Sequence, residues 1–109
     1  MSKATKIERS SGNVFQDLGL PNAEELLAKA ELVRQISEII AERKLTQAEA
    51  AQLLRTTQPK LSELLRGRLS GFSMERLLRF LKRLDRDIEI VIRPKARRRK
   101  EARLSVTAA

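Results

Sequence analysis

A chain of 109 residues, of which 41% are apolar and only three are aromatic, is long enough for one small domain with an aliphatic core. Its 23 lysine and arginine residues outnumber its 14 acidic residues, and the formal net charge of +9 favours a polyanionic partner, nucleic acid above all. Because cysteine and histidine are both absent, disulfides, thiolate chemistry, zinc sites and the usual general base are excluded, and we expect no enzyme, no metal and no cofactor.

The polar first residues and the charged last residues are expected to flank one folded region. Residues 1–21 are interpreted as an N-terminal arm, residues 22–94 as the folded domain and residues 95–109 as a basic disordered tail. No apolar run approaches the roughly 20 residues of a membrane span, and residues 1–13 lack the apolar centre of a signal peptide. We therefore expect a cytoplasmic protein without a membrane partner.

The domain is predicted to begin with a long helix that Asn22 caps and that ends near Arg43. Glu25, three residues after Asn22, completes a pattern like a capping box. The predicted buried stripe follows one line along this helix, Leu26, Val33 and Ile40, and is flanked by Ala30 and Ile36. The opposite line is acidic: Glu24, Glu31, Glu38 and Glu42. This acidic line is either an ordinary solvated face or a surface for a basic protein partner.

Two short apolar-patterned segments follow, separated by only three residues, 55–57. The first, LTQAEAAQLL, opens with a capping box from Thr46 to Glu49, and the second, TQPKLSELLRG, can be capped by Thr57. A helix, a tight turn and a second helix form the geometry that presents the second helix to the major groove of DNA. The second helix would expose side chains that can hydrogen-bond base edges or phosphates: Gln58, Lys60, Ser62 and Glu63. The alternative is that the two helices only complete a helical bundle.

A further helix, capped by Ser73, has an apolar inner face and a basic outer face that includes Arg76. Residues 88–93 then alternate, which predicts a β-strand that ends at Pro94. Three residues share one side of this predicted dimer strand: Ile88, Ile90 and Ile92. Such a strand needs a neighbour, either residues near Val14 or a second copy across a two-fold axis, and we favour the second copy. The predicted fold class is mainly α, a helix-turn-helix domain of four or five helices with one C-terminal β-strand.

The stretch Leu45–Leu54, followed by Thr57–Gly67, resembles the phage-repressor-like (XRE) family of helix-turn-helix regulators. With the flanking segments GNVFQDLGLPNAEELLAKAELV and GRLSGFSMERLLRFLKRLDRDIEIVIRP, residues 12–94 are similar to antitoxin regulators of the HigA type. The resemblance implies a sequence-specific transcriptional repressor that binds double-stranded operator DNA as a homodimer and regulates its own operon. The alternative is an antitoxin whose main role is to bind and neutralise a small basic toxin of the ribonuclease type, for which the acidic line of the first helix is the candidate surface.

Carried over by position, the resemblance assigns roles to residues of the two short helices. Base-reading positions fall on Gln58, Pro59, Lys60, Ser62 and Glu63. Phosphate contacts fall on Gln47, Thr57, Arg66 and Arg68. Two residues depart from the family's pattern. Arg55 stands where glycine is common, so a left-handed backbone there would be strained unless the turn is relaxed. Pro59 can offer only apolar contact, for example to a thymine methyl.

The C-terminal tail carries six basic residues and one acid over residues 95–103, KARRRKEAR, and thus +5 of the net charge. It is either a solvated charge run or a source of phosphate attraction beside the operator. A role in wrapping a toxin is disfavoured, because toxins of the ribonuclease class are themselves basic.

Overall fold

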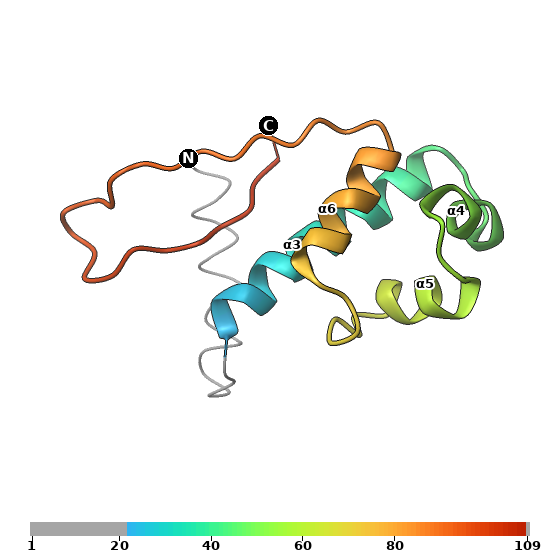
Figure 1. The fold of residues 1–109 in the computed structure, drawn as a ribbon, viewed down its shortest axis with the longest axis horizontal. Coiled ribbons are helices and arrows are strands. Elements are labelled where there is room, and N and C mark those ends of the chain that lie inside the picture. Colours follow the sequence, from blue (N-terminus) through green and yellow to red (C-terminus); the bar gives the residue numbers. More distant parts are fainter. Residues whose placement is uncertain (1–21, 109) are drawn as a thin grey trace. The chain divides into compact units, whose positions relative to one another are not determined.

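The structure, a computed structural model, describes residues 22–108 (Figure 1). This part of the chain contains four helices: α3 (Ala23–Glu42), α4 (Gln47–Leu54), α5 (Gln58–Leu65) and α6 (Met74–Arg83). The mainly α fold class is therefore confirmed. The expected N-terminal arm, with the segment near Val14, lies outside the described residues. Among the four described helices, none combines the length and the apolar character needed to cross a membrane.

Two units are distinguished along the chain, and each is described by itself. Residues 29–88 hold most of α3 and all of α4, α5 and α6, and α4 packs against both α5 and α6. The largest fully buried side chains all belong to this unit: Ile36, Leu54, Leu61, Leu64, Leu77 and Leu84. In the other unit, the described residues are the start of α3 and residues 89–108. Residues 89–108 form neither helix nor strand. The core that positions the two short helices therefore lies within residues 29–88.

The helix α3 buries a broader stripe than the sequence predicts. Val33, Ile36 and Ile40 are buried as expected, and Leu26 and Ala30 are half-buried. Further apolar residues beside the predicted stripe are also buried: Leu27, Ala28, Leu32 and Ile39. A stripe of this width indicates a helix that is covered over a wide arc rather than along one seam.

Each of the four helices ends with one residue in the left-handed region of the backbone. These residues are Lys44 (φ 56°), Arg55 (φ 59°), Gly67 (φ 93°) and Asp85 (φ 64°). In every case the following N–H donates to the carbonyl oxygen five residues earlier, at 2.9–3.1 Å: Leu45 to Ile40, Thr56 to Ala51, Arg68 to Glu63 and Arg86 to Leu81. This Schellman arrangement satisfies carbonyl groups that have no partner within the helix. At Lys44, Arg55 and Asp85 the Cβ atom makes the left-handed conformation sterically unfavourable, a cost that glycine avoids at position 67.

Polar contacts join the C-terminal ends of α3 and α6. The Arg43 Nη2 donates to the carbonyl oxygen of Leu84 at 2.7 Å and to Oδ2 of Asp85 at 3.3 Å. The Arg86 Nη2 lies 3.7 Å from Oε1 of Glu42. Because the last carbonyl groups of a helix carry partial negative charge and lack intrahelical donors, the Arg43 guanidinium stabilises the end of α6.

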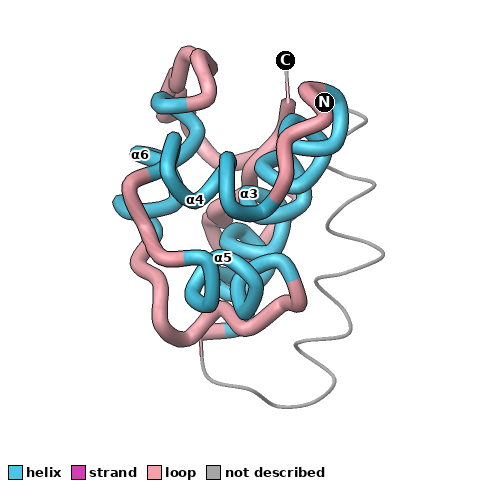
Figure 2. Tube along the Cα trace, turned by 90° about the vertical axis from the view of Figure 1, so that its right-hand side faces the viewer, coloured by secondary structure: helices cyan, strands magenta, loops and turns pink. Residues whose placement is uncertain are grey.

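The expected C-terminal β-strand is absent from the described residues, which Figure 2 shows as helix and loop alone. Residues 88–93 form no backbone hydrogen-bond ladder, and Ile90, Val91 and Ile92 are 75%, 58% and 92% exposed. An extended segment becomes a strand only when a neighbour pairs with its backbone groups, and no segment of the described single chain does so. Alternation alone is thus not enough to predict a strand here.

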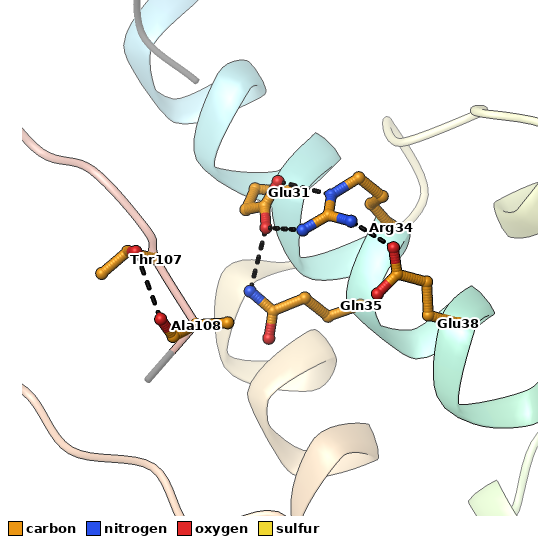
Figure 3. A network of polar contacts seen from close by, with 6 residues as sticks. All are labelled: Glu31, Arg34, Gln35, Glu38, Thr107 and Ala108. Atoms are coloured by element: carbon orange, nitrogen blue, oxygen red, sulfur yellow. Dashed lines mark hydrogen bonds and ion pairs between the residues drawn. The ribbon is translucent and has the colours of Figure 1, made fainter. Parts of the chain in front are cut away.

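Glu31 is the only buried charged residue among those that the structure describes, at 5% exposed. Figure 3 shows its carboxylate in a network along α3. Arg34 donates to it from Nε at 2.9 Å and from Nη2 at 2.6 Å, Gln35 donates from Nε2 at 3.0 Å, and Arg34 also donates to Glu38. Burial raises the pKa of the Glu31 carboxyl, but the hydrogen bonds from Arg34 and Gln35 and the charge of Arg34 outweigh it, so its pKa lies below the ordinary value.

The pH dependence of folding tests this network. Because the folded-state pKa of Glu31 is lowered, its stabilising contribution is fully present above the ordinary range of a glutamate carboxyl and is lost as the pH falls through the folded-state pKa. We expect Glu31→Gln to lower the free energy of unfolding by about 1–3 kcal/mol near neutral pH. In urea unfolding at a series of pH values, the gap between this variant and the wild type should narrow as the solution becomes acidic.

The matched control is Glu38→Gln, which removes a partner of the same arginine. The Glu38 side chain is 59% exposed, so this change should lower the free energy of unfolding by only about 0.3–0.5 kcal/mol. A gap for Glu31→Gln that stays constant over the acid range would contradict a lowered pKa.

Candidate functional site

The helix α4 begins with the capping box that the sequence predicts. Thr46 has extended backbone, its side-chain oxygen accepts from the Glu49 N–H at 3.0 Å, and the Glu49 Oε1 accepts from the Thr46 N–H at 2.8 Å. The inner side of α4 is buried at Ala50, Ala51 and Leu54. The Ala51 carbonyl accepts from the Thr56 N–H at 2.9 Å, which links the end of α4 to the turn that follows.

The turn between α4 and α5 is made by residues 55–57. Arg55 takes the left-handed conformation, φ 59° and ψ 46°, and closes α4. Thr57 returns to extended backbone and its side-chain oxygen accepts from the Lys60 N–H at 3.3 Å, so it caps α5. Pro59 fits the first turn of α5, where an N–H has no intrahelical acceptor. Arg55 therefore takes the left-handed conformation although it carries a side chain, and only three residues separate the two helices.

The helix α5 has one face in the core and one face in solvent. Leu61 and Leu64 are completely buried. The three residues of its first turn are exposed: Gln58, Pro59 and Lys60. Ser62 and Glu63 are half-buried. Thus the predicted base-reading residues lie together on α5, but only the first three are fully open to a partner.

The residues predicted to contact phosphates lie at the ends of the two helices. Gln47 is exposed at the first position of α4, and Thr57 is exposed at the cap of α5. Arg66 and Arg68 are exposed just after α5. The Arg68 Nη1 lies 3.4 Å from Oε2 of Glu63, so one phosphate candidate is paired with one base-reading candidate. Because both side chains are partly exposed, this ion pair contributes at most about 1 kcal/mol and can exchange for other partners.

Arg76 also bears on the turn, although the sequence alone placed it on the outer face of α6. Its guanidinium carbon lies 4.9 Å from the ring centre of Phe72 and 5.6 Å from that of Phe80, and Nη2 donates to the Thr56 hydroxyl at 3.4 Å. The two rings meet edge to face, 6.1 Å apart. The signal in the sequence is the spacing of four residues from Arg76 to Phe80, which places these two side chains on one face of α6, while Phe72 lies just before the cap at Ser73.

The acidic line of α3 is not uniform. Glu24, Glu38 and Glu42 are exposed, whereas Glu31 is buried. Arg34 pairs with Glu38, and Arg86 lies 3.7 Å from Glu42. The arrangement thus offers less free negative charge than the sequence suggests. Among the described residues, no group of three or more acidic side chains could hold a metal ion.

Chemically, α5 offers a mixed set of groups to a partner. Gln58 has an amide that both donates and accepts, Lys60 and the two arginines after the helix donate and carry charge, and Pro59 is apolar. The DNA major groove is wide enough to admit an α-helix, and its base edges present donors, acceptors and methyl groups. A helix that is buried on one side and exposes such groups on the other suits this groove.

Comparisons with known proteins agree with this geometry. The family described as a helix-turn-helix domain matches residues 14–93. A solved structure described as an XRE family transcriptional regulator is similar to this chain at 48% sequence identity, with a TM-score of 0.77 over 82% of this chain and 100% of that chain. No curated protein matches the chain.

The left-handed backbone of Arg55 should reverse the usual ranking of alanine and glycine. Glycine is ordinarily less stable than alanine by about 0.5–1 kcal/mol within a helix, but a Cβ in the left-handed region costs about 1–2 kcal/mol. We therefore expect Arg55→Gly to be more stable to urea unfolding than Arg55→Ala by about 1 kcal/mol. Both variants remove the same side chain, so the difference reports the backbone alone.

The same pair of substitutions at Gln52, an exposed position within α4, provides the control. There Gln52→Ala should be more stable than Gln52→Gly by about 1 kcal/mol, the ordinary order for a helix. An identical order at both positions would rule out the left-handed turn at Arg55.

Proposed function

We propose that this chain, which belongs to the XRE-type helix-turn-helix family of DNA-binding transcriptional regulators, represses its own operon as a dimer. Its operator would be a pseudo-palindrome whose two half-sites each receive one α5. Dimers of this kind place their two recognition helices about 34 Å apart, one turn of DNA, and a protein seated there excludes the polymerase by bulk. The proposal includes no enzymatic step.

The observation that supports the proposal most is the division of α5 into two faces. Leu61 and Leu64 fix the helix to the core, while its first turn stays exposed. On DNA, Gln58 would pair with adenine and Lys60 with guanine or a phosphate, and Pro59 would contact a thymine methyl. Further along the helix, Ser62 and Glu63 would contact bases nearer the edge of the interface, Glu63 by accepting from cytosine N4.

Phosphate contacts would fix the position of α5 in the groove. Gln47, Thr57, Arg66 and Arg68 lie at helix ends, where backbone N–H groups and long side chains can reach the DNA backbone. Arg68 would leave Glu63 when it reaches a phosphate, and Glu63 would then be free to read a base. Such contacts hold the register and carry no sequence information themselves.

The exposed apolar segment after α6 supports the dimer. Ile90 and Ile92 are 75% and 92% exposed and Ile88 is half-buried, which is unusual for large apolar side chains that follow one another so closely. A second copy of residues 88–93 can pair with the first, because an antiparallel neighbour satisfies the backbone groups and covers the isoleucines of both copies. We therefore retain the two-fold strand pairing as part of the proposal for the dimer.

A second candidate function is that of an antitoxin that neutralises a ribonuclease-type toxin. The exposed acids of α3, Glu24, Glu38 and Glu42, favour it as a surface for a small basic protein. Glu31 is buried in its own ion pair, and arginines of this chain lie beside Glu38 and Glu42. For this reason we rank the repressor first. Co-purification of a basic protein encoded beside this gene would support the antitoxin.

The repressor proposal predicts a selective defect for Gln58→Ala. Loss of one base-edge contact should weaken binding to the operator by about 1–3 kcal/mol and leave binding to scrambled DNA nearly unchanged. The measurement is fluorescence anisotropy with the DNA upstream of this gene and with scrambled DNA of equal length. Gln52→Ala on the neighbouring helix is the control and should change neither affinity. Equal weakening on both DNAs would remove Gln58 from base reading.

The dimer is tested by charging one side of residues 88–93. In the double variant with Ile90→Glu and Ile92→Glu, carboxylates would enter the proposed interface, so the protein should sediment as a monomer and lose cooperative binding to the operator. Val91→Glu, on the other side of the alternation, is the matched control and should remain dimeric. A wild type that is monomeric at micromolar concentration, or a double variant that stays dimeric, would count against the strand-paired dimer.

A further inference from the structure

We propose that residues 95–103 form a second DNA-contacting element, one that binds phosphates without regard to sequence and supplies most of the attraction of this protein for DNA. This inference rests on DNA being the ligand. It assigns to the C-terminal segment a role distinct from that of α5, which reads bases.

The distribution of charge is the first argument. Residues 22–94, which include all four helices, contain 14 lysine and arginine residues against 11 acids. Residues 95–103 contain six cations against Glu101. The helical part is therefore close to neutral, and more than half of the net charge of +9 lies in the short segment after it. Because nonspecific affinity for DNA is largely electrostatic, the segment is the main source of that affinity.

The state of the individual cations is the second argument. In the helical part, many arginines already lie beside acids, such as Arg34, Arg79 and Arg86. In the segment, Lys95 Nζ donates to the carbonyl oxygen of Arg99 at 2.7 Å, a hydrogen bond that leaves the charge of Lys95 without an opposite charge beside it. Arg97, Arg98 and Lys100 are exposed, and none forms an ion pair with an acid of the described residues.

The chemistry of the segment favours a nucleic-acid backbone over a protein surface. Within residues 95–103 the only uncharged residues are Ala96 and Ala102, so there is no large apolar side chain to pack against a protein partner. A duplex instead presents one phosphate about every 1.7 Å along its axis, a density that suits consecutive cations. With no aromatic residue after Phe80, the segment has no side chain on which single-stranded bases could stack.

The length of the chain allows contact close to the bound half-site. Lys95, the first of these cations, is the seventh residue after the helical unit, so the chain from Ile88 to Lys95 spans at most about 25 Å when extended. This is less than the about 34 Å of one turn of DNA. The segment can therefore bind phosphates on DNA beside the half-site that α5 of the same chain occupies.

The consequence is a specific change in salt dependence. Each phosphate contact adds about 0.9 to the slope of log affinity against log salt concentration. The test variant replaces five cations with glutamine: Lys95, Arg97, Arg98, Arg99 and Lys100. If all five bind phosphates, the slope falls by about 4 to 5 per chain, and it falls equally on operator and scrambled DNA. The preference for the operator is unchanged, because the base-reading residues are intact.

The control variant removes the same charge from the helical part, with glutamine at five other basic positions: Lys44, Arg79, Lys82, Arg83 and Arg86. Its slope should stay close to that of the wild type. Thermal unfolding checks that both variants keep their fold, which the segment variant should do because its changes lie outside the helices. Full-length protein is used throughout, with the DNA upstream of this gene and scrambled DNA of equal length.

The outcomes are separable from those of the repressor proposal. The inference is overturned if the salt slope of the segment variant equals that of the wild type, or falls no further than the slope of the control variant. Such a result would fit a segment that binds an acidic protein instead. The inference is supported if the slope of the segment variant falls on both DNAs by more than the slope of the control variant. If the wild type does not distinguish the upstream DNA from scrambled DNA, the repressor proposal fails, while the comparison of slopes still decides the role of the segment.

Discussion

The left-handed residue that closes α4 is the constraint on which the arrangement of the two short helices depends. Arg55 turns the chain so that the Thr56 N–H reaches the Ala51 carbonyl, and Thr57 then starts α5 only three residues after α4 ends. With so short a connection, α5 has little freedom, and Leu61 and Leu64 enter the core. The exposed first turn of α5 is therefore a consequence of the turn and of the two leucines together.

Arg76 connects this turn to the rest of the core. Its guanidinium lies over two phenylalanine rings and donates to the hydroxyl of Thr56, the residue before the cap of α5. Cation–π contacts are strongest where water is excluded, and Arg76 is half-buried. A residue of α6 thus braces the connection between α4 and α5 by stacking and by one hydrogen bond. The position of α5 depends on α6 as well as on its own apolar face.

The sequence predicted the local features of this fold well and the features that depend on distant groups poorly. The capping box at Thr46, the cap at Thr57 and the buried leucines of α5 follow from residue types at fixed short spacings. Burial of Glu31 depends on what packs around its side chain, which no local pattern encodes. For Arg76, local spacing indicates the contact with Phe80 but not the hydrogen bond to Thr56, 20 residues earlier in the chain. The described single chain does not form the strand predicted over residues 88–93, because alternation gives a tendency to extend but supplies no neighbour for the backbone.

A nearly neutral helical part is an advantage for a protein that must choose between DNA sequences. Phosphate contacts strengthen binding to every sequence alike, whereas base contacts strengthen binding to one. The pairing of Glu63 with Arg68 at 3.4 Å keeps part of the cationic charge near α5 engaged in the free protein, so phosphates must compete with a carboxylate for it. In the proposed complex, a cytosine amino group would donate to Glu63 once Arg68 has moved to a phosphate, so the carboxylate would keep a hydrogen-bond partner. At another base pair the carboxylate would be left without a donor close to the phosphates, and the wrong sequence would be penalised.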